Sequence, residues 1–129
     1  KEYELVLEYY KTDLILLAGF MKKIPKNIVK IYKDRIMNIH PSLLPKYGGK
    51  GFYGMKVHNA VLKSNEKNSG ATVHLVNSEY DKGEIIIQKE IKINTSDTAE
   101  TLASKVLQIE HQIYPEAIKI FFSNKVKIS

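Results

Sequence analysis

The sequence predicts a three-layer α/β protein, with a mostly parallel β-sheet and helices on both faces. Residues 14–18 are a short, continuously apolar run, which is typical of a strand buried on both faces. Residues 36–40 form a second strand, and the helix-length connection between the two makes a β-α-β unit with parallel strands. Residues 97–121 repeat apolar side chains at helical spacing, which predicts an amphipathic helix packed on the sheet.

In the first third of the chain, aspartate, glycine and proline residues mark where the predicted elements begin and end. Residues 1–11 are predicted to be the last part of a helix, because their apolar and tyrosine side chains recur near helical spacing. Asp13 precedes the apolar strand and Gly19 ends it. Pro25 suits the first turn of a short helix, which we expect to continue to about Tyr32.

The middle of the chain begins with a glycine-rich loop over residues 46–54. Its glycine spacing fits neither standard phosphate-binding pattern, so we expect a mobile lid or a simple connector. A helix follows, with Val57, Ala60 and Val61 on one side.

Two strands come next. Residues 71–76 alternate, which places Thr72 and His74 on one face and Ala71 and Val73 on the other. Residues 85–93 form the longest strand, whose polar face predicts an edge position. Its apolar face is expected to consist of Ile85, Ile87, Ile91 and Ile93.

The last helix has the clearest pattern. Asp97 is expected to cap its amino end, with Glu100 three residues later as a variant of the capping box. Pro115 lacks the N–H that would bond to the carbonyl of His111, so we expect a kink there. The predicted apolar face consists of Leu102, Val106, Ile109, Ile113, Ala117 and Phe121.

Composition bounds the function classes. A chain of 129 residues is one domain by length, and its net charge of +6 and pI near 9.4 favour anionic partners. Because its lysines are scattered, we expect a phosphorylated or polycarboxylate small molecule, with no nucleic acid and no membrane as partners. There are no cysteines, which excludes disulfides and thiolate chemistry and fits a cytoplasmic enzyme. We find neither a signal peptide nor an apolar run that could cross a bilayer.

Three polar side chains stand at predicted strand ends. Asn38 and His40 share one face of a strand, and Asp81 follows about 40 residues later in a turn sequence. An amide can stabilise an oxyanion, an imidazole can move a proton, and a carboxylate can orient and charge the imidazole. This set suits chemistry at a carbonyl carbon.

Each candidate also has a structural alternative. His40 could equally cap the turn before Pro41, and Asp81 alone would be an ordinary turn residue. His58 and His111 are expected to have surface or packing roles, and the histidine spacing predicts no metal site. Ser42 has no glycine-flanked elbow and is not expected to be a nucleophile.

Five segments together resemble the phosphoribosylglycinamide formyltransferases of the folate-dependent formyltransferase family. They match in order and spacing across nearly the whole chain, although each alone would be weak. The segments are Leu14 to Met21, Asn38 to Pro45, Gly70 to His74, Asp81 to Gln88 and Glu110 to Pro115. Pro41-Ser42 distinguishes them from relatives that carry Gly-Ser or His-Ser at this place.

The resemblance implies the formyltransferase fold and the transfer of a formyl group from 10-formyltetrahydrofolate to the amine of glycinamide ribonucleotide, in purine biosynthesis. Asn38, His40 and Asp81 resemble the family's catalytic trio, with Thr72 and His74 as supporting residues. Met21 and Glu110 resemble residues that contact the ribonucleotide. The backbone segments that would hold the folate are Met21, Lys22, Lys23 and Ile24, together with Asn77, Ser78, Glu79, Tyr80 and Asp81.

Two departures from the family leave alternatives open. The family begins with a strand and a glycine-rich phosphate loop that have no match here, so we expect the carboxyl-terminal portion of a single catalytic domain, residues 1–129, with the amino-terminal half absent. The stretch 48–69 is longer than usual. A formyltetrahydrofolate deformylase and a non-catalytic folate-binding module are the alternative functions, and homodimer formation is an option.

Overall fold

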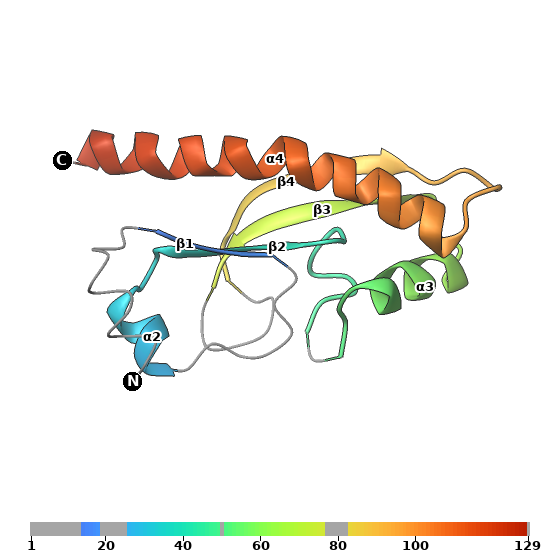
Figure 1. The fold of residues 1–129 in the computed structure, drawn as a ribbon, viewed down its shortest axis with the longest axis horizontal. Coiled ribbons are helices and arrows are strands. Elements are labelled where there is room, and N and C mark those ends of the chain that lie inside the picture. Colours follow the sequence, from blue (N-terminus) through green and yellow to red (C-terminus); the bar gives the residue numbers. More distant parts are fainter. Residues whose placement is uncertain (1–13, 19–25, 50, 77–82, 129) are drawn as a thin grey trace.

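The computed structural model describes residues 14–18, 26–49, 51–76 and 83–128. The predicted helix end at 1–11 lies outside these residues. The described elements are β1 (Ile15–Ala18), α2 (Lys26–Ile31), β2 (Ile36–His40), α3 (Met55–Lys63), β3 (Asn68–Leu75), β4 (Ile85–Lys92) and α4 (Ala99–Ile128). Their order along the chain confirms the α/β class (Figure 1).

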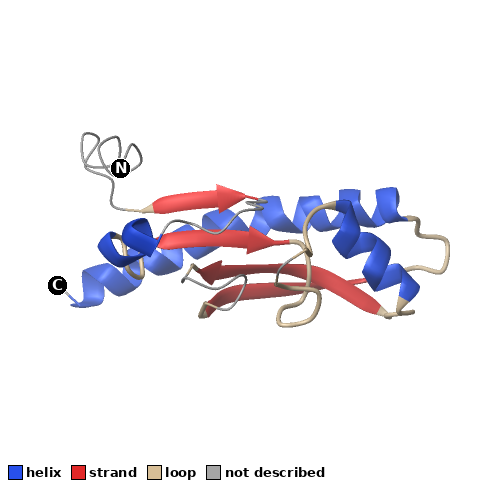
Figure 2. Cartoon of the chain, turned by 90° about the horizontal axis from the view of Figure 1, so that it is seen from below, coloured by secondary structure: helices blue, strands red, loops and turns tan. Residues whose placement is uncertain are grey.

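The four described strands form one sheet in the order β1-β2-β3-β4 (Figure 2). β1 and β2 are parallel and joined through α2, which confirms the predicted β-α-β unit. β2 with β3, and β3 with β4, are antiparallel, so the described sheet is mixed rather than mostly parallel. The reason lies in the β2–β3 pairing: α3 delivers the chain to the end of the sheet where β2 stops, and β3 runs back from there.

Apolar side chains cover both faces of this sheet, as the three-layer prediction requires. On one face, Met37 and Val73 of the sheet pack with Val57 of α3 and Val106 of α4 in the larger core. On the other, Ile28 and Tyr32 pack with Ile36 in a smaller cluster beside α2. The predicted apolar face of α4 is confirmed by five buried side chains: Leu102, Val106, Ile109, Ile113 and Ala117.

The edge strand β4 departs from simple alternation. A β-bulge opposite Val73 and His74 pairs these residues with Ile87 and Ile85, leaving Ile86 between them. Ile86 therefore packs against the core, whereas Ile85 is 45% exposed. The prediction that Ile85 belongs to the apolar face is wrong, because the extra residue reverses the alternation beyond the bulge.

The glycine-rich loop joins the turn after β2 to α3. Gly49, Gly51 and Gly54 have φ values of 93°, 88° and 53°, a conformation that favours glycine. A Cβ built on any of the three would meet nothing within 4 Å. Backbone conformation rather than space therefore calls for glycine at these positions.

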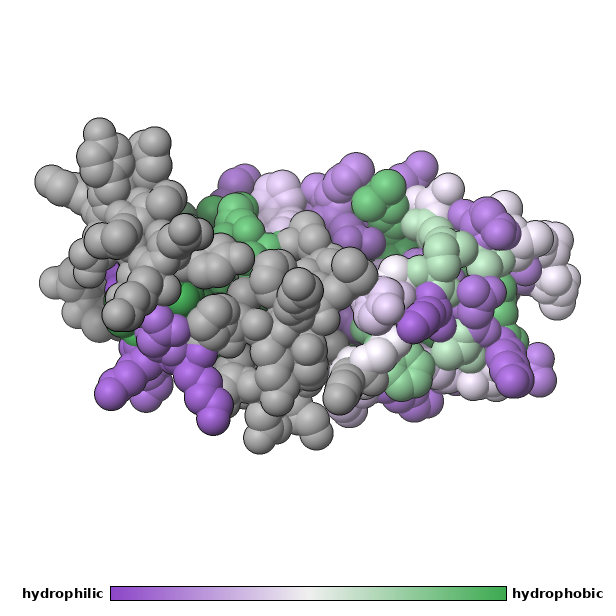
Figure 3. Space-filling model, turned by 60° about the horizontal axis from the view of Figure 1, so that its bottom comes forward, coloured by the Kyte–Doolittle hydropathy of each residue, from purple (hydrophilic) through white to green (hydrophobic). Residues whose placement is uncertain are grey.

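Hydrophilic and apolar side chains both reach the described surface. Figure 3 views the molecule from the side of α2 and α3, where hydrophilic side chains alternate with small apolar patches. Within the described ranges, no helix has both the length and the apolar character to cross a bilayer.

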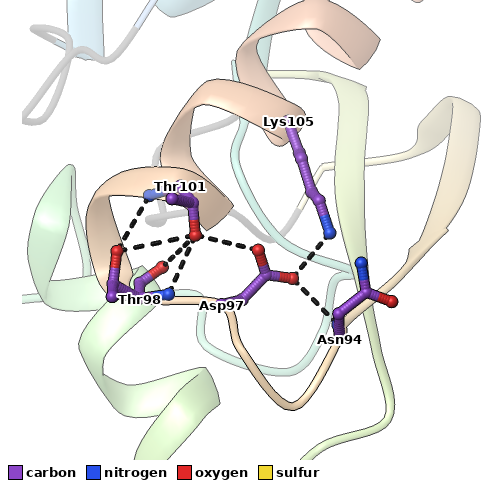
Figure 4. Close-up of polar contacts among 5 residues, drawn as sticks. All are labelled: Asn94, Asp97, Thr98, Thr101 and Lys105. Carbon is purple, nitrogen blue, oxygen red and sulfur yellow. Dashed lines mark hydrogen bonds and ion pairs between the residues drawn. The ribbon is translucent and has the colours of Figure 1, made fainter.

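The start of α4 corrects the predicted cap (Figure 4). The residue that caps the amino end of the helix is Thr98, not Asp97. The Thr98 N–H donates to Thr101 Oγ1 over 2.8 Å, and the Thr101 N–H donates to Thr98 Oγ1 over 3.2 Å. This is a capping box in which Thr101 takes the place expected for Glu100. The helix then continues through Pro115.

Asp97 lies just before the helix, and its carboxylate bonds to side chains of the first two turns. Its carboxylate accepts hydrogen bonds from Lys105 Nζ over 2.6 Å, from the Asn94 N–H over 2.8 Å and from Thr101 Oγ1 over 2.8 Å. These three bonds, the one from Lys105 foremost, lower the pKa of Asp97 to about 2.

Replacing Asp97 by asparagine should lower stability at neutral pH. Because the folded-state pKa lies below the ordinary value of 3.8, the stabilisation is complete above that value and is lost as the pH falls through about 2. Urea unfolding midpoints at pH 7, 4 and 2.5 measure this. Asp97→Asn should lose its deficit toward the lowest pH, while the control Glu100→Gln should stay near wild type throughout. A deficit independent of pH would contradict the electrostatic role.

Candidate active site

Four of the predicted site residues meet on one face of the sheet. In the antiparallel β2–β3 pair, Asn38 lies opposite His74 and His40 lies opposite Thr72. Directly opposite residues point to the same face, so their side chains form a polar cluster on the side away from the larger core. All four are buried. The prediction that Asn38 and His40 share one face is confirmed.

The amide of Asn38 is oriented by His74. The Nδ1 of His74 lies 3.0 Å from the carbonyl oxygen of Leu75, which can only accept, so Nδ1 carries the proton. His74 Nε2 is then an acceptor, 3.4 Å from Asn38 Nδ2. Asn38 Oδ1 is buried without a hydrogen-bond partner among the described residues. The second N–H of Nδ2 remains a donor for an oxyanion.

His40 is oriented by the turn that follows it. Its Nε2 lies 2.6 Å from the carbonyl oxygen of Tyr47. Since a carbonyl accepts only, Nε2 is the protonated nitrogen, and Nδ1 is the one whose protonation can change.

The hydroxyl of Thr72 holds this turn in place. Thr72 Oγ1 donates to the carbonyl of Ser42 over 2.7 Å and accepts from the Leu44 N–H over 3.1 Å. Gln88 Nε2 donates both to Thr72 Oγ1 over 2.8 Å and to the carbonyl of Leu44 over 3.0 Å. Ser42 closes the turn by donating to the carbonyl of Lys46. Thr72 and Gln88 thus fix the backbone of the turn after His40 at Ser42 and Leu44.

Sequence reasoning missed the contact of Gln88 with the turn, whereas His58 was expected to have a surface or packing role. Gln88 was expected only on a polar strand face, although its register opposite Thr72 could have indicated contact with the turn. His58 of α3 is buried, and its Nδ1 has no hydrogen-bond partner among the described residues. Burial, and secondarily the nearby His40, lower the pKa of His58, which favours a neutral imidazole there.

Glu110 lies on the other side of the sheet from the polar cluster. It lines a hollow of about 440 Å³ together with Ile39 and the α4 residues Leu107, His111, Tyr114, Pro115 and Ile118. Burial in this apolar surrounding raises the pKa of Glu110 to about 7. The Tyr114 hydroxyl donates to the carbonyls of Leu17 and Met37, tying α4 to β1 and β2.

The other predicted site residues fall outside the described part of the chain. These are Met21, Lys22, Lys23, Ile24, Asn77, Ser78, Glu79, Tyr80 and Asp81. Gly83, which follows Asp81 by two residues, is described: a Cβ there would lie 1.5 Å from the carbonyl oxygen of Leu75. Only glycine fits so close to the residue after His74. Among the described residues, no group of histidine and acidic side chains is arranged to hold a metal ion.

The fold and the cluster define a class of protein: an α/β protein with an amide and an imidazole at the carboxyl end of a parallel strand. A family model described as formyl transferase matches residues 1–118, and the chain belongs to that family. The matched domain is that of the amino-terminal region of larger family members, so our expectation of a carboxyl-terminal portion is wrong.

Similarity to individual proteins and solved structures extends this result. The chain is 48% identical to the chloroplastic phosphoribosylglycinamide formyltransferase of Arabidopsis thaliana, over 95% of this chain and 42% of that protein. Glycinamide ribonucleotide transformylase 1 of Symbiobacterium toebii has a similar structure, with a TM-score of 0.87, 36% identity, and coverage of 95% of this chain and 56% of that one. A formyltetrahydrofolate deformylase of Pseudomonas syringae pv. tomato matches with a TM-score of 0.81, 26% identity, and coverage of 91% and 38%. This chain thus spans about half the length, or less, of these relatives. The expected formyltransferase fold is confirmed.

Replacing Thr72 by valine should destabilise the protein by about 2 kcal/mol. The buried Leu44 N–H would lose its acceptor, and Gln88 Nε2 would lose one of its two hydrogen-bond acceptors. Urea denaturation measures the loss. Thr72→Ser keeps the hydroxyl and serves as the control. Equal stability of the valine and serine variants would show that the hydroxyl does not hold the turn.

Replacing Glu110 by glutamine should stabilise the protein, but only at higher pH. Because the folded-state pKa of about 7 lies above the ordinary 4.5, ionisation makes wild type lose stability as the pH rises between these values. The glutamine variant does not ionise. Its advantage in thermal midpoint should therefore be absent at pH 4 and full at pH 8. An advantage equal at both would refute the assigned burial effect.

Proposed function

We propose that this chain carries the catalytic machinery of a phosphoribosylglycinamide formyltransferase, which transfers the formyl group of 10-formyltetrahydrofolate to the amine of glycinamide ribonucleotide. The observation that carries the proposal is the oriented pair Asn38 and His40 at the end of β2, supported from β3 by Thr72 and His74. The name of the Arabidopsis thaliana relative supports the same reaction.

The chemistry begins at the formyl carbon. The amine nitrogen attacks this carbon, a C–N bond forms, and the carbonyl oxygen becomes an oxyanion. The free N–H of Asn38 Nδ2 and a proton on His40 Nδ1 are donors suited to that charge. The bond from the carbon to the folate nitrogen then breaks, and a proton lost by the attacking amine is relayed to that nitrogen.

Asp81 is the proposed partner that favours the charged form of His40, directly or through a water molecule.

The substrate positions rest on the same proposal. Residues 21–24 and 77–81 are the proposed folate contacts, through their backbone. Met21 and Glu110 are the proposed ribonucleotide contacts, as the family resemblance implies. The folate is a cosubstrate, and the mechanism uses no metal. We also propose a single catalytic domain, a cytoplasmic location, and homodimer formation as an option, with neither nucleic acid nor membrane as partner.

The second candidate is a formyltetrahydrofolate deformylase, in which water replaces the amine and formate is released. The structural match to the Pseudomonas syringae protein favours it, although at only 26% identity. Pro41-Ser42 after His40 argues for the transferase, because the resemblance places His-Ser there in deformylases.

Formyl transfer by the full-length protein decides between these functions. With 10-formyltetrahydrofolate, a transferase should release tetrahydrofolate only when glycinamide ribonucleotide is added, as followed by absorbance and by mass spectrometry of the formylated product. Release of formate without the ribonucleotide would establish the deformylase. Folate binding without either product would establish a non-catalytic module.

The variants Asn38→Ala and His40→Ala should each lower kcat by about 10² to 10³, because each removes a donor to the developing oxyanion. Asn59→Ala, an exposed position on α3, is the matched control and should retain wild-type kcat. Wild-type rates in both site variants would exclude the assigned roles.

A further inference from the structure

Glu66 is linked to His40 by a chain of hydrogen bonds that runs through Tyr47. Glu66 lies in the loop between α3 and β3. Its Oε2 accepts from the Tyr47 hydroxyl over 3.0 Å and lies 3.4 Å from Lys46 Nζ. The carbonyl oxygen of the same Tyr47 lies 2.6 Å from His40 Nε2. Tyr47 thus links the Glu66 carboxylate, through its hydroxyl, to the His40 imidazole, through its carbonyl oxygen.

Tyr47 needs to be held, because its backbone is in the left-handed region. Its φ is 57°, a conformation that tyrosine rarely adopts. The ring packs against the larger core and makes an edge contact with Phe52, with centroids 6.2 Å apart. The hydroxyl bond to Glu66 fixes the far end of the side chain.

The part of the turn secured by Thr72 does not reach Tyr47. Thr72 and Gln88 bond to the backbone of Ser42 and Leu44, and Ser42 bonds to the carbonyl of Lys46. Within the described ranges, Glu66 provides the side-chain bond to the next residue, Tyr47.

The Lys46–Glu66 ion pair contributes less to this arrangement. The Lys46 side chain is 69% exposed and that of Glu66 is 26% exposed. Such exposed pairs contribute little and are screened by salt. The buried His58, whose pKa is lowered by burial and by the nearby His40, favours its neutral form and therefore does not add a competing cation.

We propose that Glu66 and Tyr47 are positioning residues that set the tautomer of His40. By holding the Tyr47 carbonyl at Nε2, they keep the proton on Nε2 and leave Nδ1 as the nitrogen that exchanges a proton with the reaction. The catalytic consequence rests on the proposed function, whereas the effect on the tautomer does not.

Nitrogen NMR of the full-length protein tests the proposal directly, since the two ring nitrogens of a neutral histidine differ in chemical shift according to which carries hydrogen. His40 is assigned by the signal missing from His40→Asn. Tyr47→Phe keeps the ring and its packing but removes the hydroxyl, and Tyr53→Phe, in the same loop, is the matched control. Glu66→Ala removes the acceptor, while Glu66→Gln keeps an acceptor for the tyrosine.

In wild type, Tyr53→Phe and Glu66→Gln, His40 should be mainly protonated on Nε2. In Tyr47→Phe and Glu66→Ala, the two tautomers should be mixed, and kcat should fall by about tenfold with KM unchanged. Thermal midpoints show whether each variant is folded. A wild-type tautomer in folded Tyr47→Phe and Glu66→Ala would overturn the proposal. An altered tautomer in a protein whose wild type transfers no formyl group would support the positioning role and refute the proposed function instead.

Discussion

The structure of the candidate site depends on the hydroxyl of Thr72. This atom is buried between two strands and makes three hydrogen bonds, one as donor and two as acceptor, which satisfies its capacity. Its partners come from the turn after β2 and from β4. Three elements distant in sequence therefore meet at one oxygen, and this meeting point fixes the backbone of the turn at Ser42 and Leu44.

The buried His74, Asn38 and His40 side chains of the polar cluster are each oriented by a hydrogen bond. His74 is directed by the carbonyl of Leu75, and Asn38 is directed by His74. His40 is directed by the carbonyl of Tyr47. Such preorganisation places donors before a substrate arrives, so that little reorganisation is needed when charge develops. The buried and unpartnered Oδ1 of Asn38 is the exception within the described residues, and orphan polar atoms of this kind are commonly found at functional sites.

Much of the fold, but less of the site, could be predicted from sequence. β2 was predicted at its observed bounds, and the amphipathic face of α4 was predicted correctly, because both depend on local periodicity. The bulge at Ile86, the antiparallel course of β3 and the cap at Thr98 depend on partners elsewhere in the chain or on competition between adjacent threonine and aspartate side chains. The roles of Gln88 and Tyr47 were missed for the same reason, since a backbone carbonyl that orients a histidine has no sequence pattern.

The antiparallel pairing of β2 with β3 determines where the chain can change in length. Asn38, His40, Thr72 and His74 share a face only because the pairing keeps one register, and side chains alternate with a period of two. Deleting one residue inside β3 would turn Thr72 and His74 toward the larger core and bring Ala71 and Val73 to the polar side. The glycine loop before α3 imposes no such parity, because its glycines stand in open space. Insertions and deletions should therefore accumulate in that loop during evolution, while the two strands change by substitution alone.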